Sequence, residues 1–192
     1  FMYGLALALI HLVKPMRLSL WRDHPQLVWL FVGSGLTNLC FNWAVTQGDV
    51  VRVVLLFYTM PAWSIGFAWW LLQDRPGRGS FVRLALALIG VILVLKTPDT
   101  PWPVPQSLND WLALAGGAAF ALNNVMLRKL SFLPESDRMM AMFSGGTVMT
   151  ALTSLVCMPL GLVTFPTDLA WWPYALGLAL CMLGSNLSLQ RS

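Results

Sequence analysis

Uncharged polar side chains recur at helical spacing in one long apolar stretch of this sequence. Ser34, Asn38, Asn42 and Thr46 are each four residues apart, so on an α-helix they stack along one face. Amides and hydroxyls placed in this way either hydrogen-bond a solute that crosses a membrane or join neighbouring membrane helices. Both interpretations stay open for Asn38 and Asn42.

Two further apolar stretches carry amides. Asn123 and Asn124 are placed on one helix face with Gly116 and Phe120, and Asn186 stands near the end of the chain. The same two interpretations apply, with helix joining as the simpler one. We include Asn123, Asn124 and Asn186 as candidate substrate-pathway residues beside Asn38 and Asn42.

The run "LLFYTMPAWSIGFAWWLL", from Leu55 to Leu72, has no charge and carries Pro61 near its middle. A proline in a helix interior costs roughly 3 kcal/mol, because it removes one N–H donor and clashes with the preceding turn. Irregular backbone at membrane depth is tolerated where protein or a water-filled cavity covers it, so we expect the turn around Pro61 to face inward. Tyr58, one turn earlier, and Trp63 complete a candidate binding site, although Trp63 could equally face lipid.

Residues for other chemistry are scarce. No Asp or Glu lies deep in an apolar run. Neither His11 nor His24 has a nearby acid or a second metal ligand at helical spacing. No sequence matches a phosphate-binding loop with its lysine. We therefore predict no catalytic residue, metal or cofactor, and the short loops disfavour an enzyme acting on a lipid-linked substrate.

The elements that must position these residues are membrane helices. The chain has 192 residues, of which 57% are hydrophobic and 10% charged, against about 25% charged in a soluble domain. A helix needs about 20 mostly apolar residues to cross a bilayer. Seven charge-free runs approach this length or reach it with their flanks, the first being cut short by the start of the chain: 2–13, 24–48, 53–73, 84–95, 111–127, 139–167 and 169–190.

The basic residues predict an orientation. Strict alternation of the spans puts ten of the twelve Lys and Arg residues on one side and leaves Arg52 and Lys96 on the other. Short cytoplasmic loops carry such an excess. The net charge of +4 therefore indicates partners in a lipid bilayer and not nucleic acid.

The segment "KTPDTPWPVPQSLND", from Lys96 to Asp110, has four prolines in fifteen residues and is expected to be an extended outer connector. Spacings of six and seven residues recur between the second span (Trp29, Gly35, Asn42) and the seventh (Trp171, Gly177, Gly184). Spans five apart run in opposite directions, as in the inverted repeats of secondary transporters. The chain also starts inside an apolar run without Met, so a fragment is expected.

The stretch from Gly48 to Pro76, followed by "LALALIGVILVL", resembles the EamA branch of the drug/metabolite transporter superfamily. Pro61 matches the proline of the family's fourth helix, Asp74 and Arg75 match the acid and base of the following turn, and Gly90 matches the fifth-helix glycine. The family turn usually reads Gly-Glu-Arg, where this chain has Gln73 first. The spacing of Tyr58 and Pro61 also resembles the YddG-type aromatic amino-acid exporters.

The resemblance implies an all-α bundle of two inverted five-helix repeats, of which about seven helices are present. It places an incomplete first repeat at 1–97, an outer connector at 98–108 and an incomplete second repeat at 109–192. It implies a secondary transporter of the bacterial inner membrane that exports small amphipathic metabolites such as amino acids by alternating access. A membrane-embedded enzyme and a non-transporting scaffold are the alternatives.

Overall fold

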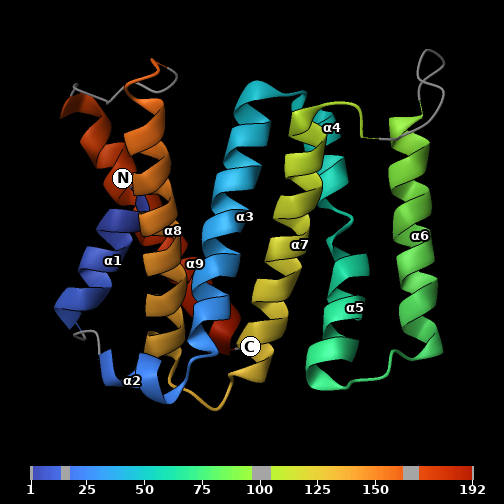
Figure 1. Ribbon diagram of the computed structural model, residues 1–192, viewed down its shortest axis with the longest axis horizontal. Coiled ribbons are helices and arrows are strands. Elements are labelled where there is room, and N and C mark those ends of the chain that lie inside the picture. The colour runs from blue at the N-terminus through green and yellow to red at the C-terminus, as the bar shows by residue number, and fades with distance from the viewer. Residues whose placement is uncertain (1, 14–17, 97–104, 162–168, 192) are drawn as a thin grey trace. The chain divides into compact units, whose positions relative to one another are not determined.

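The computed structural model describes residues 2–13, 18–96, 105–161 and 169–191, and within them the fold is helical (Figure 1). The helices are α1 (Met2–Val13), α2 (Leu18–Asp23), α3 (Leu27–Gln47), α4 (Val50–Phe57), α5 (Met60–Leu72), α6 (Arg78–Leu95), α7 (Leu108–Lys129), α8 (Glu135–Cys157), the 3-10 turn η1 (Leu169–Trp171) and α9 (Trp172–Arg191).

Each of the seven predicted spans contains a helix among the described residues, and residues 162–167 of the sixth lie outside that part. One span is divided into α4 and α5, and α2 is a short helix that the sequence did not predict. By length and composition, three stretches of the described residues suffice to cross a bilayer, namely α3, α4 together with α5, and α8. Most of the proline-rich connector, residues 97–104, lies outside the described part of the chain.

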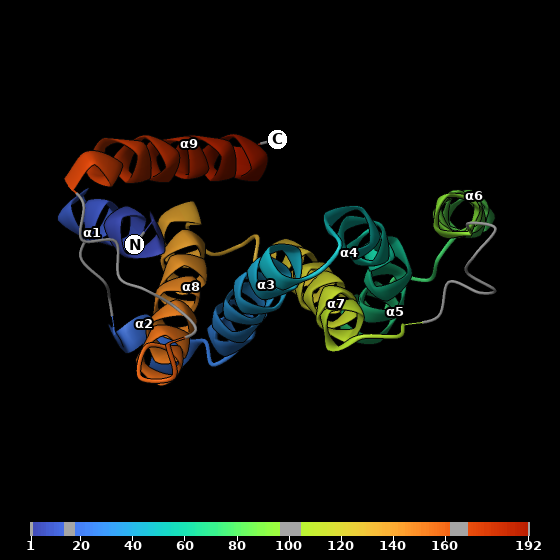
Figure 2. The ribbon, with the colours of Figure 1, turned by 90° about the horizontal axis from the view of Figure 1, so that it is seen from above.

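The chain divides into two compact units, and helix α3 passes from one to the other. The first unit comprises Phe1–Gly35 and Leu130–Ser192. In it α1 packs against both α8 and α9 (Figure 2), around a core of Ala6, Met139, Phe143 and Ala179. The first half of α3 meets α8 at Gly145, where a Cβ would clash with the carbonyl oxygen of Phe31.

The second unit is Leu36–Lys129 and holds most of the candidate site. Helix α7 packs against α4 and α5 (Figure 2). Helix α6 has contacts with the same two helices. Ala44, Val53, Leu56 and Ala113 form its core. Small residues let the helices approach: a Cβ on Gly116 would lie 3.4 Å from Cys40 Cβ.

Candidate functional site

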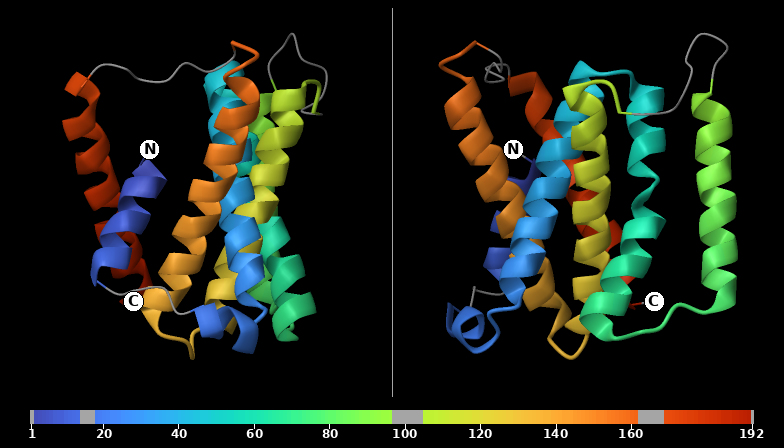
Figure 3. Two further views of the ribbon diagram at one scale, coloured as in Figure 1. Left: turned by 60° about the vertical axis from the view of Figure 1, so that its left-hand side comes forward. Right: turned by 45° about the vertical axis from the view of Figure 1, so that its right-hand side comes forward.

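The centre of the candidate site is the interruption between α4 and α5, visible in the right-hand view of Figure 3. Pro61 is the second residue of α5, which begins at Met60 after the cap residue Thr59. The first turn of a helix leaves its N–H groups unbonded in any case, so a proline costs little there. The sequence therefore tolerates Pro61 because the span is built as two helices.

The broken turn satisfies most of its own groups. Thr59 donates from its backbone N to Leu56 O at 3.1 Å and from its Oγ1 to the same oxygen at 2.7 Å. Ala62 N donates to Thr59 O at 3.0 Å, one residue short of the α-helical acceptor Tyr58. The carbonyl of Phe57 is the one that would meet residue 61, where proline offers no N–H.

Helix α7 covers this released carbonyl. A Cβ built on Gly117 would lie 2.7 Å from Phe57 O, so only glycine permits the approach. The Phe57 ring contacts those of Phe41 and Phe120 in tilted arrangements, with centroid distances of 4.6 Å and 5.6 Å. The irregular backbone is thus covered by protein, which is the condition for its existence in a membrane.

Tyr58 and Trp63 lie on the outside of this unit. Tyr58 is 54% exposed and Trp63 is 44% exposed, and Pro61 between them is half-buried. The Trp63 ring stacks on Phe67 at 6.4 Å. The break therefore has a covered face toward α7 and an open face that carries the two aromatic side chains.

The polar stripe of α3 bonds mainly to its own helix. Asn42 donates from Nδ2 to Asn38 O at 2.7 Å, and Thr46 donates from Oγ1 to Asn42 O at 2.9 Å. Asn38 is half-buried and Asn42 is exposed. Ser34 differs, because its Oγ donates to Met142 O of α8 at 2.8 Å and so joins two helices of the first unit.

The amides of the later spans do not form one group. Asn123 and Asn124 were expected to share a face, but Asn123 is 3% exposed and Asn124 is exposed. Consecutive residues differ by about 100° around a helix, which is enough to separate them at the edge of a packed seam. Asn186 lies on α9 in the other unit, and its side chain is outside the described part.

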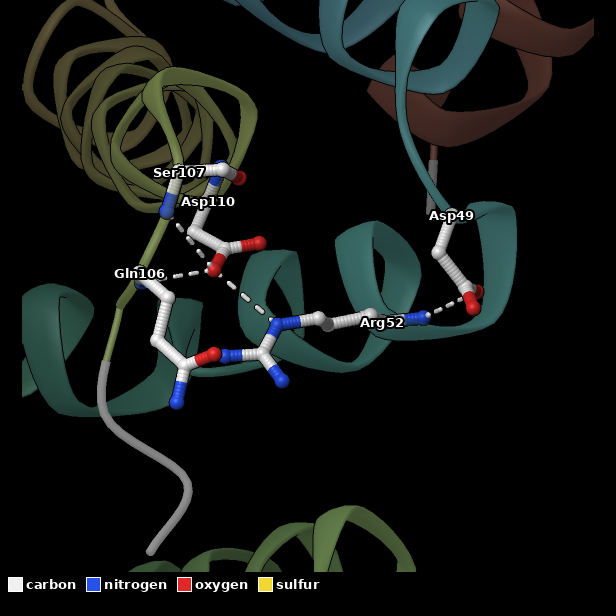
Figure 4. A network of polar contacts seen from close by, with 5 residues as sticks. All are labelled: Asp49, Arg52, Gln106, Ser107 and Asp110. Atoms are coloured by element: carbon white, nitrogen blue, oxygen red, sulfur yellow. Dashed lines mark hydrogen bonds and ion pairs between the residues drawn. The ribbon is translucent and has the colours of Figure 1, made fainter. Parts of the chain in front are cut away.

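A polar network where α4 and α7 begin was not predicted (Figure 4). Arg52 Nε lies 3.0 Å from Asp110 Oδ2, and the same oxygen accepts from Gln106 N at 2.8 Å. Asp49 Oδ1 caps α4 by accepting from Arg52 N at 3.1 Å. The spacing of Ser107 and Asp110 is that of a helix-capping pair, and this was the signal available in the sequence.

Asp110 stands at the start of α7, ahead of the charge-free run that begins at Trp111. Burial alone would raise the pKa of its carboxyl. The hydrogen bond from Gln106 N, the guanidinium of Arg52 and the N–H of Ser107 outweigh burial and hold the pKa below its usual range. The carboxylate is therefore the stable form that ties α4 to α7.

The turn after α5 shows how Gln73 stands where the family pattern has glycine. Gln73 caps α5 in the left-handed conformation, with φ of 57°, which glycine adopts without strain. Asp74 pairs with Arg128 in the last turn of α7 (3.1 Å), whereas Arg75 is exposed. Gly90 on α6 has open space where a Cβ would stand.

A comparison with known protein families agrees with a membrane protein built around a broken span. The model of the EamA-like transporter family matches residues 1–96, the stretch that includes the broken span and the turn after it. The chain belongs to the EamA-like transporter family. No curated protein and no solved structure gave a match. As a family member with helices long and apolar enough to span a bilayer, the chain is a multi-pass membrane protein of the transporter type.

Proposed function

We propose that this family member is a secondary transporter of the bacterial inner membrane. It would export small amphipathic metabolites, amino acids among them, by alternating access. The observation that supports this most is the broken span, in which a central turn leaves the helical ladder while α7 covers its released carbonyl. Secondary transporters bind substrate at such discontinuous helices near the bilayer midplane.

The proposed pathway follows the second unit. It includes Asn38, Asn42, Tyr58, Pro61, Trp63, Asn123 and Asn124. Asn186, on α9 of the other unit, stays a separate candidate from the sequence. The open face of the break carries an exposed phenol and indole, and Asn42 is an exposed amide on α3. Together these groups offer an apolar body and a polar tip, which suits an amphipathic solute.

The test is counterflow of labelled amino acids into proteoliposomes that contain the full-length protein. We expect Tyr58→Phe and Asn42→Ala each to lower the initial rate about tenfold or more, since a lost hydrogen bond to bound solute is worth roughly 1.4 kcal/mol. Tyr174→Phe is the matched control, because Tyr174 is exposed on α9 and is outside the proposed pathway.

Wild-type rates in both Tyr58→Phe and Asn42→Ala would contradict the site assignment. No flux from correctly folded wild-type protein, with any amino acid, would contradict transport of this class and favour a non-transporting scaffold.

A further inference from the structure

Asn123 on α7 has a buried side-chain amide whose oxygen accepts no hydrogen bond from the described residues. Its side chain is 3% exposed, and its Oδ1 has no hydrogen-bond partner among the residues that the structure describes. Buried polar groups in folded proteins are almost always hydrogen-bonded. This oxygen therefore requires an explanation.

The other polar side chains of the spans show how such groups are usually satisfied. Thr147 and Thr150 on α8 each donate to the carbonyl four residues earlier, at 2.7 Å and 2.6 Å, as Asn42 does on α3. A carbonyl oxygen has two lone pairs and can accept this second donor. A donor in a membrane helix can thus be satisfied by a carbonyl of its own helix, as these three are, or by one of a neighbouring helix, as Ser34 is.

A side-chain acceptor cannot be satisfied by the backbone of its own helix. In the middle of a helix every backbone N–H already donates to the carbonyl four residues before it, so no N–H is left for Asn123 Oδ1. Turning the amide over would exchange the oxygen with Nδ2 and would leave the acceptor still dependent on an outside group. Only a donor from outside α7 can satisfy it.

The surroundings of Asn123 specify what kind of molecule could bring that donor. Phe120 lies one turn earlier on α7, and its ring contacts that of Phe57, which in turn contacts Phe41. Residues three apart on a helix are neighbours. An acceptor beside an aromatic wall matches a molecule with an N–H or O–H at one end and an apolar body.

We propose that Asn123 Oδ1 is the acceptor for the amino N–H of the transported solute and so selects amines over analogues without a donor. This inference rests on the proposed function. It assigns Asn123 a role in solute recognition in place of the helix joining that its sequence context favoured.

The test uses a matched pair of ligands and a matched pair of variants in the purified full-length protein. 2-Phenylethylamine and its N,N,N-trimethyl derivative carry the same charge and ring, but only the amine has N–H donors. Asn123→Leu removes the acceptor and keeps a branched side chain, and Asn109→Leu makes the same change at the start of α7, outside the proposed pathway. Thermal unfolding is measured against ligand concentration.

We expect the wild-type protein and Asn109→Leu to bind the amine about tenfold more tightly than the trimethyl derivative, a difference of roughly 1.4 kcal/mol. Asn123→Leu should lose this preference. Without ligand, Asn123→Leu should unfold at a temperature no lower than the wild type, since the substitution removes an unmet buried acceptor.

Three results would overturn the inference: no preference in the wild type, a preference that persists in Asn123→Leu, or a marked loss of stability in Asn123→Leu alone. The last would show that the oxygen has a partner within the protein. Counterflow by the wild type decides the proposed function separately. Amine preference without flux would uphold the role of Asn123 and refute transport, whereas flux without preference would do the reverse.

Discussion

Gln73 shows how one residue can depart from its family's pattern and still end a helix. The N–H of the next residue, Asp74, donates to Ala68 O at 3.4 Å. The backbone of Gln73 itself takes a positive φ, and its side-chain Nε2 donates to Trp70 O at 3.1 Å. The left-handed conformation costs a non-glycine residue about 1–2 kcal/mol. The glycine of the usual family turn avoids that cost at this position.

Replacing Gln73 with glycine should therefore stabilise the protein. We expect Gln73→Gly to raise the free energy of unfolding by about 0.5–1 kcal/mol, because the relief of strain is partly offset by the loss of an exposed hydrogen bond. Gln73→Ala keeps the strain and loses the bond, so it should be no more stable than the wild type. Thermal unfolding in detergent measures both, and equal effects of glycine and alanine would contradict this account.

At the scale of elements, the seam between the broken span and α7 depends on the absence of side chains. A Cβ on Gly117 would meet the carbonyl oxygen of Phe57. This oxygen belongs to the backbone, so it cannot rotate away as a side chain could. Pro61 removes the donor that this carbonyl would otherwise have. The break and the small residue are thus complementary parts of one joint between α4, α5 and α7.

Adding a single methyl group at this joint should weaken it. We expect Gly117→Ala to destabilise the protein by about 1–3 kcal/mol, as overpacking does in other cores. Gly90→Ala on α6 is the matched control, because its Cβ would meet open space and alanine favours a helix by up to about 1 kcal/mol. The two should shift the unfolding temperature in opposite directions, and a neutral Gly117→Ala would show that the joint is loose.

At the scale of the whole molecule, packing and repeat organisation need not coincide. The unit Leu36–Lys129 combines α4, α5 and α6 with α7, although the sequence assigned α7 to a second repeat starting at residue 109. A repeat is a relation between segments of the chain, whereas a packing unit records which helices touch. The repeat boundaries at 97 and 109 accordingly stay a prediction, as does the orientation drawn from the basic residues.

Two ion pairs fasten α7 to the broken span, and they should differ in strength. Asp110 is 4% exposed in its pair with Arg52, while Asp74 and Arg128 are 51% and 68% exposed in theirs. Removing one partner of a buried pair leaves a buried charge and costs about 3–5 kcal/mol, whereas exposed pairs contribute about 0–1 kcal/mol. We expect Arg52→Met to destabilise the protein strongly and Arg128→Met very little.

Thermal unfolding of the two single variants checks this difference, and similar losses would contradict it.

The lowered pKa of Asp110 predicts how the stability of the protein changes with pH. Because the folded protein lowers this pKa, its contribution to stability is present above the ordinary carboxyl pKa and is lost as the pH falls through the lowered value. Stability of the wild type should therefore decline in acid, and Asp110→Asn should reduce that decline.

The sequence by itself determined the helical spans, the position of the break and the family. Charge-free runs of bilayer length admit only helices, because the backbone must satisfy its own hydrogen bonds in lipid, and Pro61 marks where that ladder fails. Tertiary structure alone decided which polar side chains have a hydrogen-bond partner. Asn42 and Asn123 each stand at helical spacing from other residues of an apolar run. Only packing shows that Asn42 is exposed and donates to Asn38 O. Packing likewise shows that Asn123 Oδ1 is buried and has no hydrogen-bond partner among the described residues. Spacing fixes the face of a helix, and the neighbours that cover that face come from distant parts of the chain.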